Sequence, residues 1–75
     1  MEIKFTVKQA RKYAGFTQLE VSKRMGIDRG TYIRLEKNPG SMTIDQARTF
    51  SQITSIPYDS IFFVNDSTLS RGEEP

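Results

Sequence analysis

The sequence contains no cysteine, no histidine and no tryptophan. Without cysteine, neither a disulfide framework nor a cysteine-based zinc finger can form, which fits a reducing cytoplasm. Without histidine and cysteine, the chain also lacks the commonest general base and the best thiol nucleophile, and it has no glycine-rich phosphate loop. We therefore do not expect an enzyme, and we predict no metal site, no cofactor and no small-molecule ligand.

Long apolar runs are also missing. No stretch approaches the ~20 apolar residues that a membrane-spanning helix needs, and no signal peptide is recognisable. We therefore expect a cytoplasmic protein with no membrane partner. A chain of 75 residues makes one small domain, near the lower size limit for a core that is held without disulfides or metal.

Charge divides the chain into two parts. Residues 1–64 carry ten Lys or Arg against six Asp or Glu, a net charge of +4, whereas residues 65–75 carry one basic and three acidic residues. A basic body can attract a polyanion. Residues 65–75 are polar and lack periodicity, so we predict a domain over residues 1–64 followed by a flexible polar tail over 65–75.

Helix-start signals recur along the domain. A threonine is followed three residues later by Gln or Glu at three places, which is the spacing of a capping box. Asp28 is a good N-cap for one further helix, and Pro57 suits the first turn of a brief helix over residues 58–63. The three threonine pairs are Thr6 with Gln9, Thr17 with Glu20, and Thr43 with Gln46. These signals predict an all-α fold of five short helices around one core.

Residues that favour a helix end follow the predicted helices. Gly15 and Gly26 fall where a helix end needs a residue that accepts a positive φ. Asn38 opens a breaker-rich loop and also tolerates the left-handed conformation. A short lead-in before Thr6 can be frayed or can add a strand.

Residues 17–37 are predicted to form two short helices separated by a tight turn. On the second helix, one side carries Tyr32, Leu35 and Glu36. The opposite side carries Arg29, Gly30, Ile33, Arg34 and Lys37. A helix that shows cations to solvent and is braced by another helix is what reading a DNA major groove requires.

The sequence resembles the lambda-repressor/Cro family of phage and bacterial regulators over residues 5–63. The matching segments are Phe16-Thr17-Gln18, Gly26-Ile27, Thr31-Tyr32 and Arg34-Leu35-Glu36, with Arg11, Gly15 and Ile61-Phe62-Phe63 outside them. The resemblance implies a lambda-repressor-like domain with a helix-turn-helix at helices 2 and 3. It also implies a sequence-specific regulator of transcription that binds double-stranded DNA, of the repressor type found in phages or mobile elements. Asn38 departs from the family, which usually has glycine there, and Met42 replaces a frequent proline.

The resemblance assigns several roles. It implies that Gln18, with its side chain free of the core, bonds a phosphate and supports the first residue of the recognition helix. It also implies that Arg11 and Glu36 form a partly buried salt bridge between helices 1 and 3, although Arg11 could instead be a solvated arginine whose stem covers the core. Lys37 and Asn38 resemble positions that bond phosphate.

Base readers are predicted from the residue types. Arg29, in the first turn of the recognition helix, suits guanine; Arg34, about 140° away on the helical wheel, can reach a phosphate instead. Ile33 can pack on a thymine methyl, or it can serve the core or a partner protein. Gly30 can allow close backbone approach or reflect drift. Tyr32 is expected in the core with its hydroxyl at the surface. The candidate DNA-binding residues are Thr17, Gln18, Asp28, Arg29, Gly30, Thr31, Ile33, Arg34, Lys37 and Asn38.

The apolar residues near the end of the domain supply more apolar surface than a short terminal helix can bury. We expect part of it in the core and the remainder in a homodimer that binds a palindromic operator. The residues are Ile56, Tyr58, Ile61, Phe62 and Phe63. The alternative function is an antitoxin-type protein-binding module whose tail binds a toxin and whose DNA binding is autoregulatory.

Overall fold

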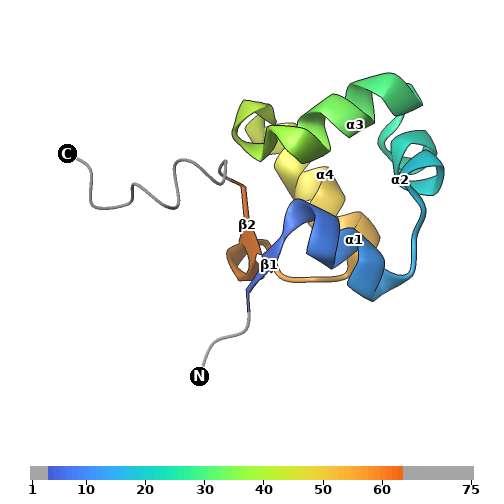
Figure 1. The fold of residues 1–75 in the computed structure, drawn as a ribbon. Helices are drawn as coiled ribbons and strands as arrows, with labels where there is room; N and C mark the ends of the chain where they lie inside the picture. Colours follow the sequence, from blue (N-terminus) through green and yellow to red (C-terminus); the bar gives the residue numbers. More distant parts are fainter. Residues whose placement is uncertain (1–3, 64–75) are drawn as a thin grey trace.

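Four α-helices make up most of residues 4–63, which are the residues that the computed structural model describes. The helices are α1 (Val7–Ala14), α2 (Gln18–Met25), α3 (Arg29–Lys37) and α4 (Ile44–Thr54). Two 3-10 turns cover Pro39–Ser41 and Tyr58–Ser60, and two short strands are β1 (Phe5–Thr6) and β2 (Ile61–Phe62) (Figure 1). The expected tail over residues 65–75 lies outside the described residues.

The starts of the helices follow the predicted caps. At α1, α2 and α4 a threonine hydroxyl accepts a hydrogen bond from the backbone amide three residues on, and the side-chain oxygen of that residue accepts one from the threonine backbone amide. These six bonds are 2.8 to 3.1 Å long. Three predicted capping boxes are therefore confirmed. The side chain of Asp28 caps α3 as predicted.

The predicted helix ends at Gly15 and Gly26 are confirmed. Gly15 and Gly26 adopt left-handed backbone, with φ of 87° and 78°. Asn38 tolerates the left-handed conformation but does not adopt it: its φ is −127°, and the chain continues directly into the turn at Pro39–Ser41. The left-handed end of α4 is Ser55, with φ 60°, which no glycine or asparagine signal marked.

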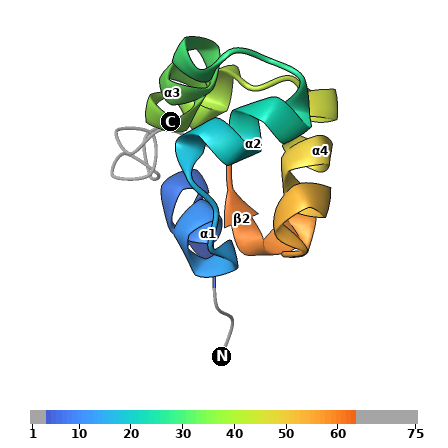
Figure 2. The ribbon, with the colours of Figure 1, turned by 90° about the vertical axis from the view of Figure 1, so that its right-hand side faces the viewer.

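The core lies where the four helices and the closing segment meet. Tyr32 of α3 and Phe50 of α4 are fully buried, with ring centroids 6.5 Å apart, and the ring of Phe63 meets Phe50 edge-on. Figure 2 shows α2 between α3 and α1, and α2 packs against both α3 and α4. The buried cluster consists of Val7, Ala10, Val21, Tyr32, Phe50, Ile56 and Ile61.

The predicted fifth helix at residues 58–63 is wrong. One 3-10 turn is followed by extended backbone, and Ile61 and Phe62 pair in parallel with Phe5 and Thr6. Extended backbone places alternate side chains on opposite faces. Ile61 is buried and Phe63 packs against the core, whereas the ring of Phe62 lies under the ammonium of Lys4 at 5.4 Å. The fold is thus mostly helical with a small parallel strand pair, rather than all-α.

None of the helices within residues 4–63 combines the length and apolar character needed to cross a bilayer.

Candidate nucleic-acid interface

Helices α2 and α3 are joined by a tight turn over residues 26–28. The amide of Ile27 donates to the carbonyl of Ser22 at 3.0 Å, which closes the end of α2. One residue later, the carboxylate of Asp28 accepts from both the amide and the hydroxyl of Thr31, at 3.0 and 2.8 Å. The hydroxyl and amide of Thr31 lower the pKa of Asp28, so the cap is charged at neutral pH. These local bonds set the angle at which α3 leaves α2.

Gly30 has a structural explanation that the sequence did not suggest. A Cβ built on Gly30 would lie 3.2 Å from Oδ2 of Asp28, closer than an ordinary van der Waals contact. A side chain at this position would therefore press on the carboxylate that caps α3. The bare position leaves room for the cap as well as an exposed stretch of helix backbone.

The carboxylate of Glu36 is a junction of three helices. Nε of Arg11, from α1, lies 2.7 Å from Oε2 of Glu36, and these side chains are only 10% and 6% exposed. Nε2 of Gln18, at the start of α2, donates to Oε1 at 2.8 Å. The hydroxyl of Tyr32, one turn earlier on α3, donates to Oε2 at 2.7 Å. The expected contact between Arg11 and Glu36 is therefore present, with two further donors on the same carboxylate.

The protonation states of this junction follow from the donors. Burial acts to raise the pKa of Glu36, but the hydrogen bonds from Arg11, Tyr32 and Gln18 outweigh it, so the net shift is downward. The hydrogen bond with Glu36 raises the pKa of Arg11 against the opposing effect of burial. Burial and the neighbouring carboxylate raise the pKa of Tyr32, which keeps its proton. The pair is thus ionised at neutral pH, with its charges compensated inside the fold.

Two side chains differ from the sequence expectation here. The side chain of Gln18 was expected to be free of the core, but Gln18 is half-buried and its amide nitrogen donates to Glu36. Because a carboxylate only accepts hydrogen bonds, the nitrogen of the amide must face it, and the amide oxygen with one remaining N–H points elsewhere. The hydroxyl of Tyr32 was expected at the surface, but it is bonded to Glu36 and Tyr32 is fully buried.

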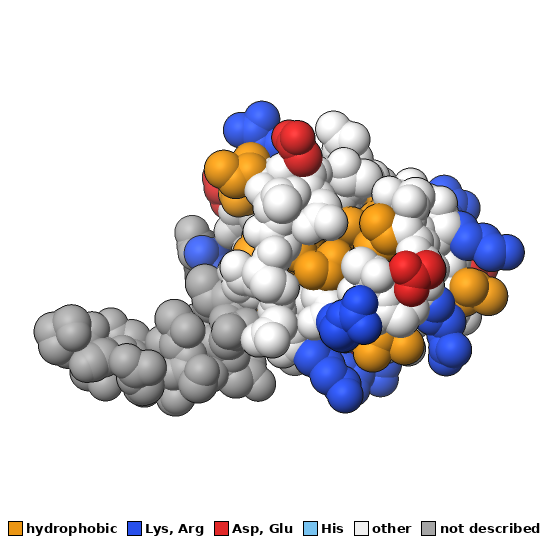
Figure 3. Space-filling view, turned by 90° about the horizontal axis from the view of Figure 1, so that it is seen from above, with side chains coloured by type: hydrophobic (Ala, Val, Ile, Leu, Met, Phe, Trp, Pro, Cys, Tyr) orange, Lys and Arg blue, Asp and Glu red, His pale blue; other side chains and the backbone are white. Residues whose placement is uncertain are grey.

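The predicted outward face of α3 is largely exposed. Arg29, Gly30, Arg34 and Lys37 are exposed, whereas Ile33 is half-buried. Figure 3, which looks down on the molecule from the α3 side of Figure 1, shows Lys and Arg side chains at the edges of this face and apolar side chains between them. Thr17 and Asn38, at neighbouring helix ends, are also exposed, and Thr31 is half-buried.

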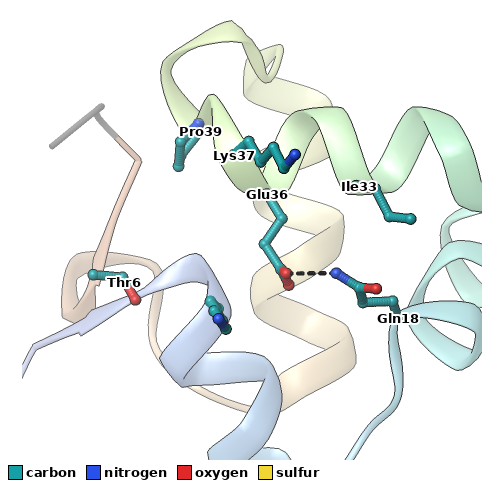
Figure 4. A pocket seen from close by; sticks show the side chains of 7 residues that line it. Thr6, Gln18, Ile33, Glu36, Lys37 and Pro39 are labelled. Carbon is teal, nitrogen blue, oxygen red and sulfur yellow. Dashed lines mark hydrogen bonds between the residues drawn. The ribbon is translucent and has the colours of Figure 1, made fainter.

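An open groove of about 350 Å³ brings several predicted residues together. Gln18 from α2 and Ile33, Glu36 and Lys37 from α3 line it (Figure 4). Gln18 also lines a second hollow that contains Thr17 and Arg29. Gln18 therefore connects the groove beside Lys37 with the hollow beside Arg29, while Arg34 and Asn38 line neither.

The groove has a wall that the sequence analysis missed. Thr6 and Lys8 from the start of α1 line it, together with Pro39. A sequence signal for Lys8 exists: it lies three residues before Arg11 and so shares its helix face. Once Arg11 is paired with Glu36 of α3, Lys8 must lie near α3 as well.

A family model described as helix-turn-helix, of the Cro/C1 type, matches residues 7–61. The chain belongs to this family. The match begins at the first residue of α1 and ends in β2, so it covers all four helices. Membership makes the chain a DNA-binding regulator with double-stranded DNA as its ligand. No sequence among the curated proteins matches the chain.

Acidic residues do not gather into a metal site in the described part of the helix-turn-helix domain. No group of three or more His, Cys, Asp or Glu within residues 4–63 is placed to hold a metal ion.

Proposed function

We propose that this helix-turn-helix protein is a sequence-specific transcriptional repressor of phage or mobile-element type, with residues 28–37 as the recognition helix in the DNA major groove. The observation that carries the proposal is the junction at Glu36. It ties the start of α2 to α3, so that Gln18 and the exposed cations of α3 belong to one rigid surface. A preorganised surface binds DNA without a large ordering cost.

In this proposal, residues in the first turn of α3 contact the DNA bases. Arg29 is exposed and follows the cap at Asp28, so its two-donor fork can meet the O6 and N7 atoms of guanine. The bare backbone at Gly30 and the half-exposed Thr31 allow close approach there. Ile33 offers an apolar contact for a thymine methyl, and Arg34, farther round the helix, reaches the groove wall.

Phosphate contacts position the protein in this proposal without selecting bases. Thr17 and Gln18 lie at the start of α2, and Lys37 and Asn38 lie at the end of α3. Gln18 retains one N–H for a phosphate while its other donor is held by Glu36. Lys37 presents an exposed ammonium on a flexible stem, which suits a phosphate better than a base edge.

A homodimer on a palindromic operator completes the proposal. Ile56 and Ile61 are buried in the core, so the surface left for a dimer contact consists of Tyr58, which is 42% exposed, and the half-buried Phe62 and Phe63. Two such protomers would read half-sites about one helical turn apart. The antitoxin alternative depends on residues 65–75, which lie outside the described residues, and it stays a prediction.

Binding-site selection from a random DNA pool tests the assignment of roles. Wild type should select a two-fold symmetric site, and Arg29→Ala should flatten preference at one symmetric pair of positions, each worth about 1–3 kcal/mol. Lys37→Ala, the matched loss of one cation, should weaken all sequences alike and leave the sequence logo unchanged. An unchanged logo for Arg29→Ala, with uniformly weaker binding, would contradict its role in base reading.

Salt dependence tests DNA binding itself. A dimer that neutralises about six phosphates should show a slope near −5 in a plot of log affinity against log salt concentration. Fluorescence anisotropy with the selected duplex, between about 50 and 200 mM salt, measures this slope. A flat response would remove the support for DNA as the ligand.

A further inference from the structure

The first turn of α1 forms one side of the groove beside α3, outside the two helices that the proposed function uses. Thr6 lines this side, and Lys37 and Pro39 line the other (Figure 4). Lys8, from the first turn of α1, also lines the groove. The two sides are held together one turn farther along α1, where Arg11 contacts Glu36 at 2.7 Å. The groove is therefore a fixed feature of the fold rather than a chance gap between mobile side chains.

The charges around this groove are unequal. Its one acidic lining residue, Glu36, already accepts hydrogen bonds from Arg11, Gln18 and Tyr32. The ammonium groups of Lys8 and Lys37 have no ion pair or hydrogen bond with any residue in the described range 4–63. The groove thus presents the ammonium groups of Lys8 and Lys37 without an acidic partner in the described residues, because the charge of Glu36 is already paired with Arg11.

The remaining lining suits a sugar-phosphate strand. The half-buried Ile33 adds apolar surface that a deoxyribose can contact, and the free N–H of Gln18 can donate to a phosphate oxygen. Lys37 and Gln18 are already phosphate contacts in the proposed function. A strand that meets both lies along the groove that Lys8 also lines.

We propose that Lys8 binds a backbone phosphate of the DNA strand that passes along this groove, so that α1 extends the DNA footprint beyond α2 and α3. This inference rests on the proposed function and adds a contact to it. Lys8 contributes affinity and position, because an ammonium on a backbone phosphate carries no base information. The groove then holds the strand between helix α1 and the end of α3.

Lys8→Ala tests the contact, with Lys12→Ala as the matched control. Lys12 is an exposed lysine on the same helix that does not line the groove, so both variants change the net charge equally. Lys8→Ala should lower the magnitude of the salt slope by about 0.9 per protomer, which corresponds to about fivefold weaker binding per protomer at 0.15 M salt. The sequence logo should be unchanged, Lys12→Ala should match wild type, and Lys8→Arg should restore the slope.

Ethylation interference locates the phosphate. Ethylation of one particular phosphate on each half-site should block DNA binding by wild type. The same ethylation should leave binding by Lys8→Ala unchanged. If wild type binds its site with a steep salt slope but Lys8→Ala and Lys12→Ala have equal slopes, the contact is wrong while the proposed function stands. If wild type shows no salt-dependent duplex binding, the proposed function and this contact are both overturned.

Discussion

Removing Glu36 tests whether one buried carboxylate holds three helices together. The variant Glu36→Ala leaves the guanidinium of Arg11 without its ion pair, although Arg11 keeps its bond to the carbonyl of Phe16 at 2.9 Å. It also removes the acceptor for the buried hydroxyl of Tyr32 and for the amide of Gln18. An uncompensated buried charge and an unsatisfied buried hydroxyl both destabilise the folded state.

The magnitude follows from the burial of the pair. Breaking a buried ion pair by removing one partner costs about 3–5 kcal/mol, whereas an exposed pair contributes about 0.2–1 kcal/mol. The side chain of Arg11 keeps 10% exposure and one backbone partner, so we expect the low end, about 3 kcal/mol. For a domain of this size, such a loss lowers the melting temperature by about 12–24 °C.

A double-mutant cycle with Arg11→Ala, followed by urea melts, measures the interaction. Each single variant should lose about 3 kcal/mol, and the double variant should lose only slightly more, because removing the second partner relieves the unpaired charge. The coupling energy should therefore be about 2–3 kcal/mol. Since the singles can approach the full stability of a small domain, Glu36→Gln, which keeps an acceptor, serves as a milder variant. Additive losses, or single losses below about 0.5 kcal/mol, would show that the pair is no stronger than a surface contact.

Two further predictions concern stability. The pKa of Glu36 is lowered from its ordinary value of 4.5, so its contribution should be complete above pH 4.5 and lost as the pH falls through the folded-state pKa. Urea melts from neutral to acid pH should show a steeper loss for wild type than for Glu36→Gln, and parallel curves would contradict this. Gly26→Ala should destabilise the fold by about 1–2 kcal/mol, because φ is 78° and no atom within 4 Å offers another cause. Gly26→Asn should recover part of the loss, since asparagine tolerates this conformation, and equal melting curves for the three proteins would show that the turn needs no left-handed residue.

Most of the helix boundaries follow from short-range signals in the sequence. The capping boxes at Thr6, Thr17 and Thr43, and the left-handed ends at Gly15 and Gly26, were all predicted and found. Each depends on hydrogen bonds between residues three to five positions apart, or on the conformational freedom of one residue. Such local interactions form in the same way whatever the remainder of the chain does. The family was likewise visible in the order and spacing of short segments.

The strand at the end of the described chain could not be predicted from local sequence signals. Pro57 is compatible with a helix start, but Ile61 and Phe62 became a strand because Phe5 and Thr6, at the other end of the described chain, offered backbone partners. A strand needs a neighbour to satisfy its amides and carbonyls, and a sequence window does not contain that neighbour. The choice between helix and strand was therefore made by the tertiary structure.

The candidate interface also has features that the sequence predicts and features that depend on how the helices pack. The sequence indicated which cations of α3 face outward, because helical periodicity depends only on position in the helix. The packing of the helices was needed to show that Gln18 and Tyr32 share the carboxylate of Glu36, and that Lys8 and Lys37 line the same groove. Those arrangements join side chains from separate helices, and their geometry exists only once the core has packed the helices at one set of distances and angles.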